Sequence, residues 1–335
     1  MVVSLILRRR EPMNNNEKIS SPLTRLLLPI DINLEWTRIV ELASSIASTV
    51  KDRIETVTVL YVMKGRFLSE HMANIDSRID EIIKSEKFKE LKQKFIKNEI
   101  EPELLKIVER FRELDGDTPV EWMVKDGKVA DQIFKTAEEG LYSTIIMERR
   151  RLSAVEEMFL GSVTEDLIHR NLDATFYLAG KELPRPGQSP VRNTIICADG
   201  SESSKAAVRE AAILIGKSDK TQLKRATIMR VVDIANYEEQ VERGEDPEQK
   251  AQAILDEAKE SMIGLGVPEE IIETRLLHGD PVEAICKAAD EQEVDMIFMG
   301  RKGRGSSSFA EIVLGSITRG VIHHCHTPTL AIVNK

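Results

Sequence analysis

The sequence predicts an α/β fold made of two tandem, open, parallel five-stranded sheets covered by helices. Short apolar segments alternate with amphipathic helical segments, and this alternation occurs twice along the chain. The length of 335 residues also suits two domains better than one. Continuous apolar strands are buried on both faces, which is typical of parallel sheets between layers of helices.

The first strand and the first helix recur in both halves. Residues 25–31 form an apolar run that ends in Asp31, and an amphipathic helix is predicted over 34–50. Residues 193–199 likewise end in Asp199, and a helix is predicted over 204–215.

The later elements recur in the same order, so each half reads β-α-β-α-β-α-β-α-β. The matching segments are 57–62 and 226–231 for the second strand, 125–127 and 278–280 for the turn before the next helix, 144–147 and 295–299 for the fourth strand, 159–162 and 313–316 for a Leu-Gly-Ser motif, and 174–179 and 329–333 for the fifth strand.

The first half is longer because of an insertion. Residues 67–114 are rich in Lys and Glu, with apolar residues at helical spacing, and predict two surface helices. In the second half, the matching region 237–265 predicts one long amphipathic helix.

Composition changes divide the chain into segments. We expect a flexible N-terminal lead over 1–21, a first domain over 22–180 that contains the insertion, a linker rich in Gly and Pro over 181–192, and a second domain over 193–335.

Charge and cysteine content narrow the class of protein. Acidic residues exceed basic ones by 56 to 47, giving a net charge of -9, so nucleic acid is not expected as a partner. No apolar run approaches the roughly 20 residues that span a bilayer, and we expect no membrane association. Three widely spaced cysteines, Cys197, Cys286 and Cys325, cannot build a disulfide framework. These features predict a soluble cytoplasmic protein.

The second half carries groups suited to a phosphate. Asp199, Val231 and Met299 lie at the carboxyl ends of predicted strands, where open parallel sheets bind ligands. Met299 is followed by a segment rich in Gly and Ser, residues 300–308, and then by a second turn of small residues, 315–318. Glycines allow close backbone approach, and amides and hydroxyls donate to phosphate oxygens. The sequence therefore predicts a phosphate cradle.

This arrangement resembles the tandem two-domain form of the universal stress protein family, over nearly the whole chain after Ser21. The family's signature is Gly, two residues, Gly, nine residues, Gly, then Ser or Thr. Here eleven residues separate Gly303 from Gly315, whereas nine separate Gly305 from Gly315. Either Gly303 or Gly305 can therefore be the second signature glycine.

The resemblance implies a Rossmann-like fold, similar to adenine nucleotide alpha hydrolases, and binding of ATP or AMP, with Mg²⁺ beside a triphosphate. Asp199 would contact the ribose or adenine side, and Val231 would bind adenine through its backbone. The implied binding residues are Ala198, Asp199, Val231, Met299, Gly300, Gly303, Gly305, Gly315, Ser316, Ile317 and Thr318. It also implies an intramolecular pseudo-dimer through the fifth strands, 174–179 against 329–333, and a homodimer of such chains.

The first half departs from this signature. Glu148 and Arg151 stand where the family has its two glycines, and the Glu148 carboxylate would repel a phosphate. We expect no nucleotide in this half. Arg149, Arg150 and Arg151 either bind a phosphate through their side chains or, as we prefer, form a solvated or interdomain charged face.

Several other groups have two interpretations. Asp31 is expected to order the turn after its strand, whereas Asp199 is expected to contact ligand. Residues 306–308, all serines, form either a flexible loop or a phosphate contact, and Arg301, Lys302 and Arg304 are expected to attract an anion without fixed geometry. The residues 323–326, His-His-Cys-His, are expected to be structural, because adjacent side chains on a helix diverge and cannot all bind one metal ion.

No catalytic group set is evident. The chain has no P-loop motif and no base placed to activate water near a γ-phosphate, so we expect at most slow ATP hydrolysis. The predicted function is a nucleotide-binding regulatory protein, whose first half is a structural or partner-binding copy. The alternative is a nucleotide-free scaffold that recruits a protein partner through 67–114, and an adenylating enzyme ranks third.

Overall fold

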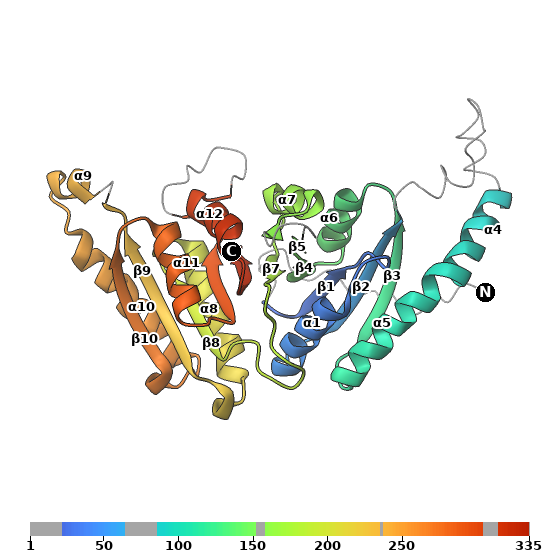
Figure 1. Ribbon diagram of the computed structural model, residues 1–335, viewed down its shortest axis with the longest axis horizontal. Coiled ribbons are helices and arrows are strands. Elements are labelled where there is room, and N and C mark those ends of the chain that lie inside the picture. The colour runs from blue at the N-terminus through green and yellow to red at the C-terminus, as the bar shows by residue number, and fades with distance from the viewer. Residues whose placement is uncertain (1–21, 64–85, 152–157, 235–236, 304–313, 335) are drawn as a thin grey trace, which may run out of the picture.

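The computed structural model describes residues 22–63, 86–151, 158–234, 237–303 and 314–334 (Figure 1). The N-terminal half contains β1 (Arg25–Pro29), α1 (Thr37–Thr49), β2 (Thr56–Met63), α4 (Glu86–Phe95), a π-helical turn η1 (Ile96–Ile100), α5 (Glu101–Leu114), β3 (Val120–Asp126), α6 (Val129–Glu139), β4 (Thr144–Glu148), β5 (Arg150–Arg151), β6 (Met158–Phe159), α7 (Ser162–His169) and β7 (Thr175–Ala179).

The C-terminal half repeats this order. It contains β8 (Asn193–Cys197), α8 (Glu202–Lys217), η2 (Lys220–Gln222), β9 (Arg225–Val232), α9 (Tyr237–Glu242), α10 (Pro247–Gly264), η4 (Glu269–Ile271), β10 (Ile272–His278), α11 (Pro281–Glu291), β11 (Met296–Gly300), α12 (Ser316–His324) and β12 (Thr329–Val333). Among the described residues, no helix is both long enough and apolar enough to cross a bilayer.

Ten strands join in one sheet, in the order β10-β9-β8-β11-β12-β7-β4-β1-β2-β3. Each half is parallel within itself, as the apolar strands predict. The halves meet where β12 pairs antiparallel with β7, with Ala331 opposite Tyr177. The expected pairing of the fifth strands is therefore present, and it merges the two predicted sheets into one continuous sheet that runs across the molecule (Figure 1).

The sheet is buried on both faces. On β1, Leu26 and Leu28 belong to one apolar cluster and Leu27 to the other, because successive side chains of a strand point to opposite faces. The first cluster contains residues of α1, α5, α8 and α10, and the second contains residues of α6, α7, α11 and α12. Helices thus cover both faces in both halves, as the continuous apolar strands predict.

The structure differs in detail from two of the helix predictions. Within the predicted insertion, 67–85 lies outside the described residues, and 86–114 forms one uninterrupted helical segment, α4 to α5, joined by a π turn. The α5 part is not merely a surface helix, because Leu104, Ile107 and Phe111 are buried in the core. Burial of this apolar stripe makes α5 the counterpart of α10.

The predicted helix over 237–265 is divided into α9 and α10. Gly244 has a φ of 75°, a left-handed conformation that ends a helix. Asp246 then caps the next helix by accepting from the backbone N–H groups of Glu248 and Gln249, and Pro247 occupies its first turn. The amphipathic pattern continues across this break, which is why periodicity alone did not reveal it.

Two buried arginines are exchanged between the halves. Arg149, directly after β4, donates to the carbonyl oxygens of Cys325, His326 and Pro328 in the other half and to that of Ala179 in its own. Arg301, directly after β11, donates to the carbonyl oxygens of Ile168, Arg170 and Leu172. The two side chains occupy equivalent positions of the repeat. Each one donates hydrogen bonds to backbone carbonyl groups of the opposite half.

These contacts decide the roles of both residues. Burial lowers the pKa of each guanidinium to about 10, so both stay charged at neutral pH. Arg149 is an interdomain residue, the alternative preferred from the sequence. Arg301 is also an interdomain residue, which corrects the expectation that it attracts an anion without fixed geometry.

A buried carboxyl group also joins the halves. Glu210 of α8 accepts hydrogen bonds from the hydroxyls of Thr175 and Tyr177 on β7, each at 2.7 Å. Burial raises the pKa of Glu210 to about 7, although these hydrogen bonds oppose the shift. Desolvation therefore dominates at this position.

Replacing Arg149 tests the interdomain contacts. Arg149→Leu leaves several buried carbonyl groups without a donor, and we expect the free energy of unfolding to fall by about 3 kcal/mol. Arg319→Leu removes the same side chain from the exposed face of α12 and is the matched control. Equal urea-unfolding midpoints for the two variants would contradict the role given to Arg149.

The pH dependence of stability tests Glu210. Its pKa is raised in the folded protein, so its stabilising contribution is complete below the ordinary carboxyl value of 4.5 and is lost as pH rises through about 7. Between pH 4.5 and pH 8, Glu210→Gln should gain about 3 kcal/mol of unfolding free energy relative to wild type. Urea unfolding across this range measures the difference, and a constant difference would refute the assignment.

Candidate functional site

The predicted site lies at the carboxyl ends of three neighbouring strands in the C-terminal half. Ala198 and Asp199 directly follow β8, Val231 is next to last on β9, and Met299 and Gly300 end β11. These residues are brought together because β8 lies between β9 and β11, and the strand order reverses between β8 and β11. In open α/β sheets such a reversal opens a ligand crevice.

The turn after β8 is ordered by Asp199. Its Oδ1 accepts from the backbone N–H of Ser201 at 2.9 Å and from the Ser201 hydroxyl. Ser201 in turn caps α8, because its Oγ accepts from the backbone N–H of Ser204 at 3.2 Å. Asp199 therefore fixes the entry to α8, in addition to the ligand contact expected from the sequence.

The loop after β11 is held between the N-terminal ends of two helices. On the α8 side, the Ser203 hydroxyl donates to the carbonyl oxygen of Lys302. On the α12 side, the Thr318 hydroxyl donates to the carbonyl oxygen of Gly300 at 2.9 Å, and the Gly315 N–H donates to that of Arg301 at 3.0 Å. The described part of the predicted cradle is therefore an ordered structure.

Glycine is required at position 300 for packing. A Cβ added to Gly300 would lie 2.7 Å from the Ser204 backbone nitrogen and 2.8 Å from the Ser203 carbonyl carbon. A Cβ on Gly303 would lie 2.8 Å from the Asp199 Oδ2. From the sequence, glycine was expected here because it lets the backbone approach a phosphate. At Gly300 the close packing of α8 alone explains why the residue has no side chain.

The start of α12 presents backbone donors. Gly315 is its N-cap, Ser316 and Ile317 are exposed, and Thr318 is buried with its hydroxyl directed at Gly300. The first N–H groups of a helix have no partner within the helix and carry a partial positive charge. The α12 N-terminus thus has the chemistry of an anion site.

Part of the predicted cradle lies outside the described residues. This applies to Arg304, to Gly305 and to the serines at 306–308. The choice between Gly303 and Gly305 as second signature glycine therefore stays open.

The equivalent edge of the N-terminal half has different chemistry. Glu148 forms an ion pair with Arg38, whose Nε lies 3.5 Å from Oε1, and Arg38 also donates to the carbonyl oxygens of Gly180 and Lys181. At the start of α1, Glu35 accepts from the backbone N–H of Thr37 at 2.8 Å. The Glu35 carboxylate thus accepts a hydrogen bond from one of the N–H groups at the N-terminus of α1, a donor that could otherwise bind an external anion. The sequence pointed to Glu148 but not to Glu35 or Arg38.

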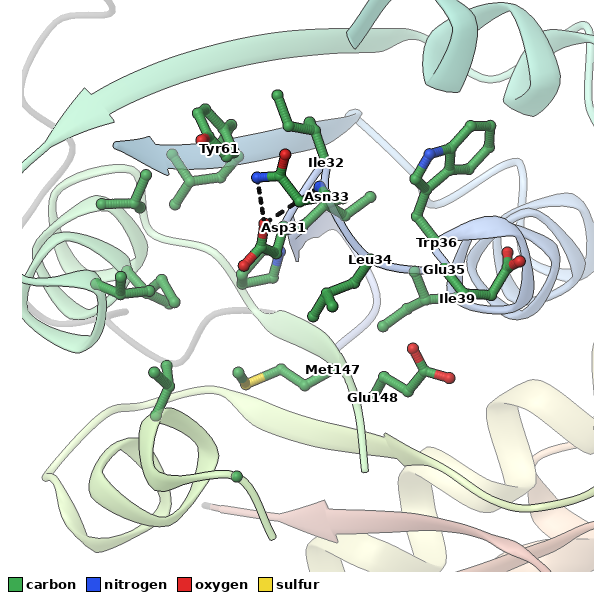
Figure 2. A pocket seen from close by; sticks show the side chains of 18 of the residues that line it. Asp31, Ile32, Asn33, Leu34, Glu35, Trp36, Ile39, Tyr61, Met147 and Glu148 are labelled. Atoms are coloured by element: carbon green, nitrogen blue, oxygen red, sulfur yellow. Dashed lines mark hydrogen bonds between the residues drawn. The ribbon is translucent and has the colours of Figure 1, made fainter. Parts of the chain in front are cut away.

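A cavity of about 1240 Å³ opens at this N-terminal edge (Figure 2). Asp31 lies among its lining residues and accepts from the backbone N–H and the side-chain amide of Asn33, at 3.2 and 3.1 Å. The expectation that Asp31 orders this turn is confirmed.

The His-Cys segment and Cys197 are the remaining candidates from the sequence. His323 and His324 belong to the last turn of α12, and Cys325 is its C-cap. Within the described residues, no cluster of three metal-ligating side chains is present. Burial raises the pKa of Cys197 to about 12, which makes it a poor nucleophile.

The fold is that of a tandem protein of the doubly wound α/β class, with glycines and helix N-terminal donors at one edge and carboxylates among the described residues of the equivalent edge. The sequence model of the universal stress protein family matches residues 23–170 and 190–332. These two matches cover most of the chain, which therefore belongs to the universal stress protein family, in a tandem arrangement.

Several individual proteins are similar to this chain. Universal stress protein Rv1636 of Mycobacterium tuberculosis is 30% identical over 149 residues, which are 43% of this chain and 97% of the relative. A universal stress protein structure from Archaeoglobus fulgidus aligns over 92% of this chain and 98% of its own, with a TM-score of 0.59 and 21% identity. A universal stress protein solved in complex with cAMP is 28% identical, covers 43% of this chain and 97% of its own, and has a TM-score of 0.32.

Substitution of Gly300 tests the packing argument. Gly300→Ala forces a Cβ against the backbone of α8, and we expect the free energy of unfolding to fall by about 2 kcal/mol. Gly264→Ala is the matched control, because nothing lies within 4 Å of its added Cβ. If both variants unfold at the same urea concentration, the close approach of α8 does not explain the glycine.

Proposed function

We propose that this chain is a regulatory protein whose C-terminal half binds ATP or AMP, while the N-terminal half serves as a structural or partner-binding copy. This proposal rests on one observation: hydroxyl groups at the N-terminal ends of α8 and α12 donate hydrogen bonds to the loop from Gly300 to Gly303. Helix N-termini and glycine-rich backbone favour the phosphates of a nucleotide. Adenine would lie beside Val231 and the ribose beside Asp199.

Mg²⁺ would accompany a bound triphosphate. The donors described at this edge are mostly N–H groups and hydroxyls, which suit phosphate oxygens, and Asp199 supplies a carboxylate. Since Mg²⁺ keeps several waters and takes phosphate oxygens as ligands, one nearby carboxylate fits its requirements.

A binding role is favoured over catalysis by the groups present. In the described part of the C-terminal edge, no nucleophile is paired with a general base, and the Cys197 thiol stays protonated. We propose at most slow hydrolysis of bound ATP. A cytoplasmic location, a homodimer and a protein partner for the N-terminal half also belong to this proposal.

A charge placed at the α12 N-terminus tests nucleotide binding. Ser316 is exposed at the first position of this helix, where an acidic side chain is favourable for folding. Ser316→Asp should nevertheless repel phosphates and weaken ATP or AMP binding about tenfold or more, measured by isothermal titration calorimetry. cAMP is a useful third nucleotide in the series.

The repeat supplies a matched control. Ser162 is exposed at the first position of α7, the equivalent helix of the N-terminal half. Ser162→Asp should leave nucleotide affinity unchanged. Equal loss in both variants, or no binding to wild type, would reject the proposal. Mass spectrometry of gently denatured, freshly purified protein separates it from a nucleotide-free scaffold, which would carry no adenine nucleotide.

A further inference from the structure

The cavity of the N-terminal half lies at the position equivalent to the proposed nucleotide site of the other half, but the side chains that line it have a different chemistry. It opens beyond the carboxyl ends of β1 and β4, at the reversal of strand order in this half. Its volume of about 1240 Å³ is ample for a small organic molecule. The fold thus keeps a ligand-sized space at this edge.

The charges facing this cavity are predominantly negative. Among its described lining residues, carboxylates outnumber guanidinium groups five to two. The acidic residues are Asp31, Glu35, Glu99, Glu103 and Glu148. The hydroxyl of Thr37, and after it the backbone N–H of the same residue, hold the pKa of Glu35 below its usual range, so this group is anionic at neutral pH.

The two arginines do not reverse this balance. Arg149 is buried and donates to four backbone carbonyl groups away from the cavity. Arg38 donates to the carbonyl oxygens of Gly180 and Lys181 and pairs with Glu148. An anionic ligand would therefore meet carboxylates before it met a guanidinium group.

Most of the other described lining residues are aromatic or apolar. Figure 2 shows Asp31 and Leu34 between Tyr61 on one side and Met147 and Glu148 on the other, with Trp36 and Glu35 at the start of α1. Leu34 is 53% exposed, an apolar surface that a ligand could cover. Aromatic faces beside carboxylates are the combination that recognises organic ammonium groups.

We propose that this cavity binds an organic ammonium compound, with its cationic group near Asp31 and its apolar body against Tyr61 and Leu34. The inference is independent of nucleotide binding, because it concerns the other half of the repeat. It gives the N-terminal half a small ligand of its own, of opposite charge to a nucleotide.

Calorimetric titration of the full chain in an amine-free buffer tests this. The probes are spermidine, a flexible polycation, and phenethylamine, an aromatic ring with one ammonium group. Phenylacetate, which carries a carboxylate on a similar body, is the counter-probe. We expect at least one ammonium probe to bind at one site per chain and phenylacetate not to bind.

An isosteric variant locates the binding. Asp31→Asn removes a charge but keeps an oxygen that can accept from Asn33, so the local turn is retained. It should weaken binding of the ammonium probe about tenfold. Asp117→Asn removes the same charge from a side chain that is 80% exposed and should change nothing.

Three outcomes would overturn the proposal: neither ammonium probe binds, phenylacetate binds as tightly, or Asp31→Asn has no more effect than Asp117→Asn. Ser316→Asp distinguishes this proposal from the nucleotide proposal, since it should leave ammonium binding unchanged. Asp31→Asn should likewise leave ATP binding unchanged.

Discussion

The reciprocal exchange of Arg149 and Arg301 across the β7–β12 pairing is the constraint on which both proposed ligand edges depend. Each arginine follows the strand whose end forms an edge, and each donates to backbone carbonyl groups of the opposite half. Leaving such groups without donors is costly in a buried interface. The loop that begins at Gly300 is therefore positioned partly by the N-terminal half, which gives that half a structural role whatever it binds.

Within this common frame, the two edges diverge through a few side chains at helix starts. In the C-terminal half, short hydroxyl side chains, Ser201 and Ser203, cap α8 and hold the adjacent loop, so an anion can approach. In the N-terminal half, the Glu35 carboxylate accepts from the backbone N–H of Thr37 in the first turn of α1. Glu148 stands at the position equivalent to Gly300. A carboxylate at a helix N-terminus uses the same partial charge that would attract a phosphate. Both carboxylates disfavour an anion and favour a cation by simple electrostatics.

Much of the fold could be predicted from the sequence, because it follows from local patterns. Continuous apolar strands indicated a sheet buried on both faces, and the resemblance to the universal stress protein family implied the pairing of the fifth strands. The break at Gly244 was missed because amphipathic spacing continues across it. The buried positions of Arg149 and Arg301 could not be predicted from the local sequence, because most of their partners are carbonyl groups more than a hundred residues away. Asp31 was interpreted correctly, since its partner is only two residues distant.

The same arginines bear on whether the two edges communicate. Arg301 joins the loop beside Gly300 to the segment after α7, and Arg149 joins the acidic cavity to the segment after α12. Spatial continuity of this kind is not in itself a coupling, because energy passes between sites only through an element with two arrangements that both ligands bias. The two halves share a continuous sheet and are joined by buried guanidinium groups that each donate several hydrogen bonds. This favours a single arrangement of the two halves. The architecture therefore favours independent binding at its two edges, with the interface serving to hold each loop in place.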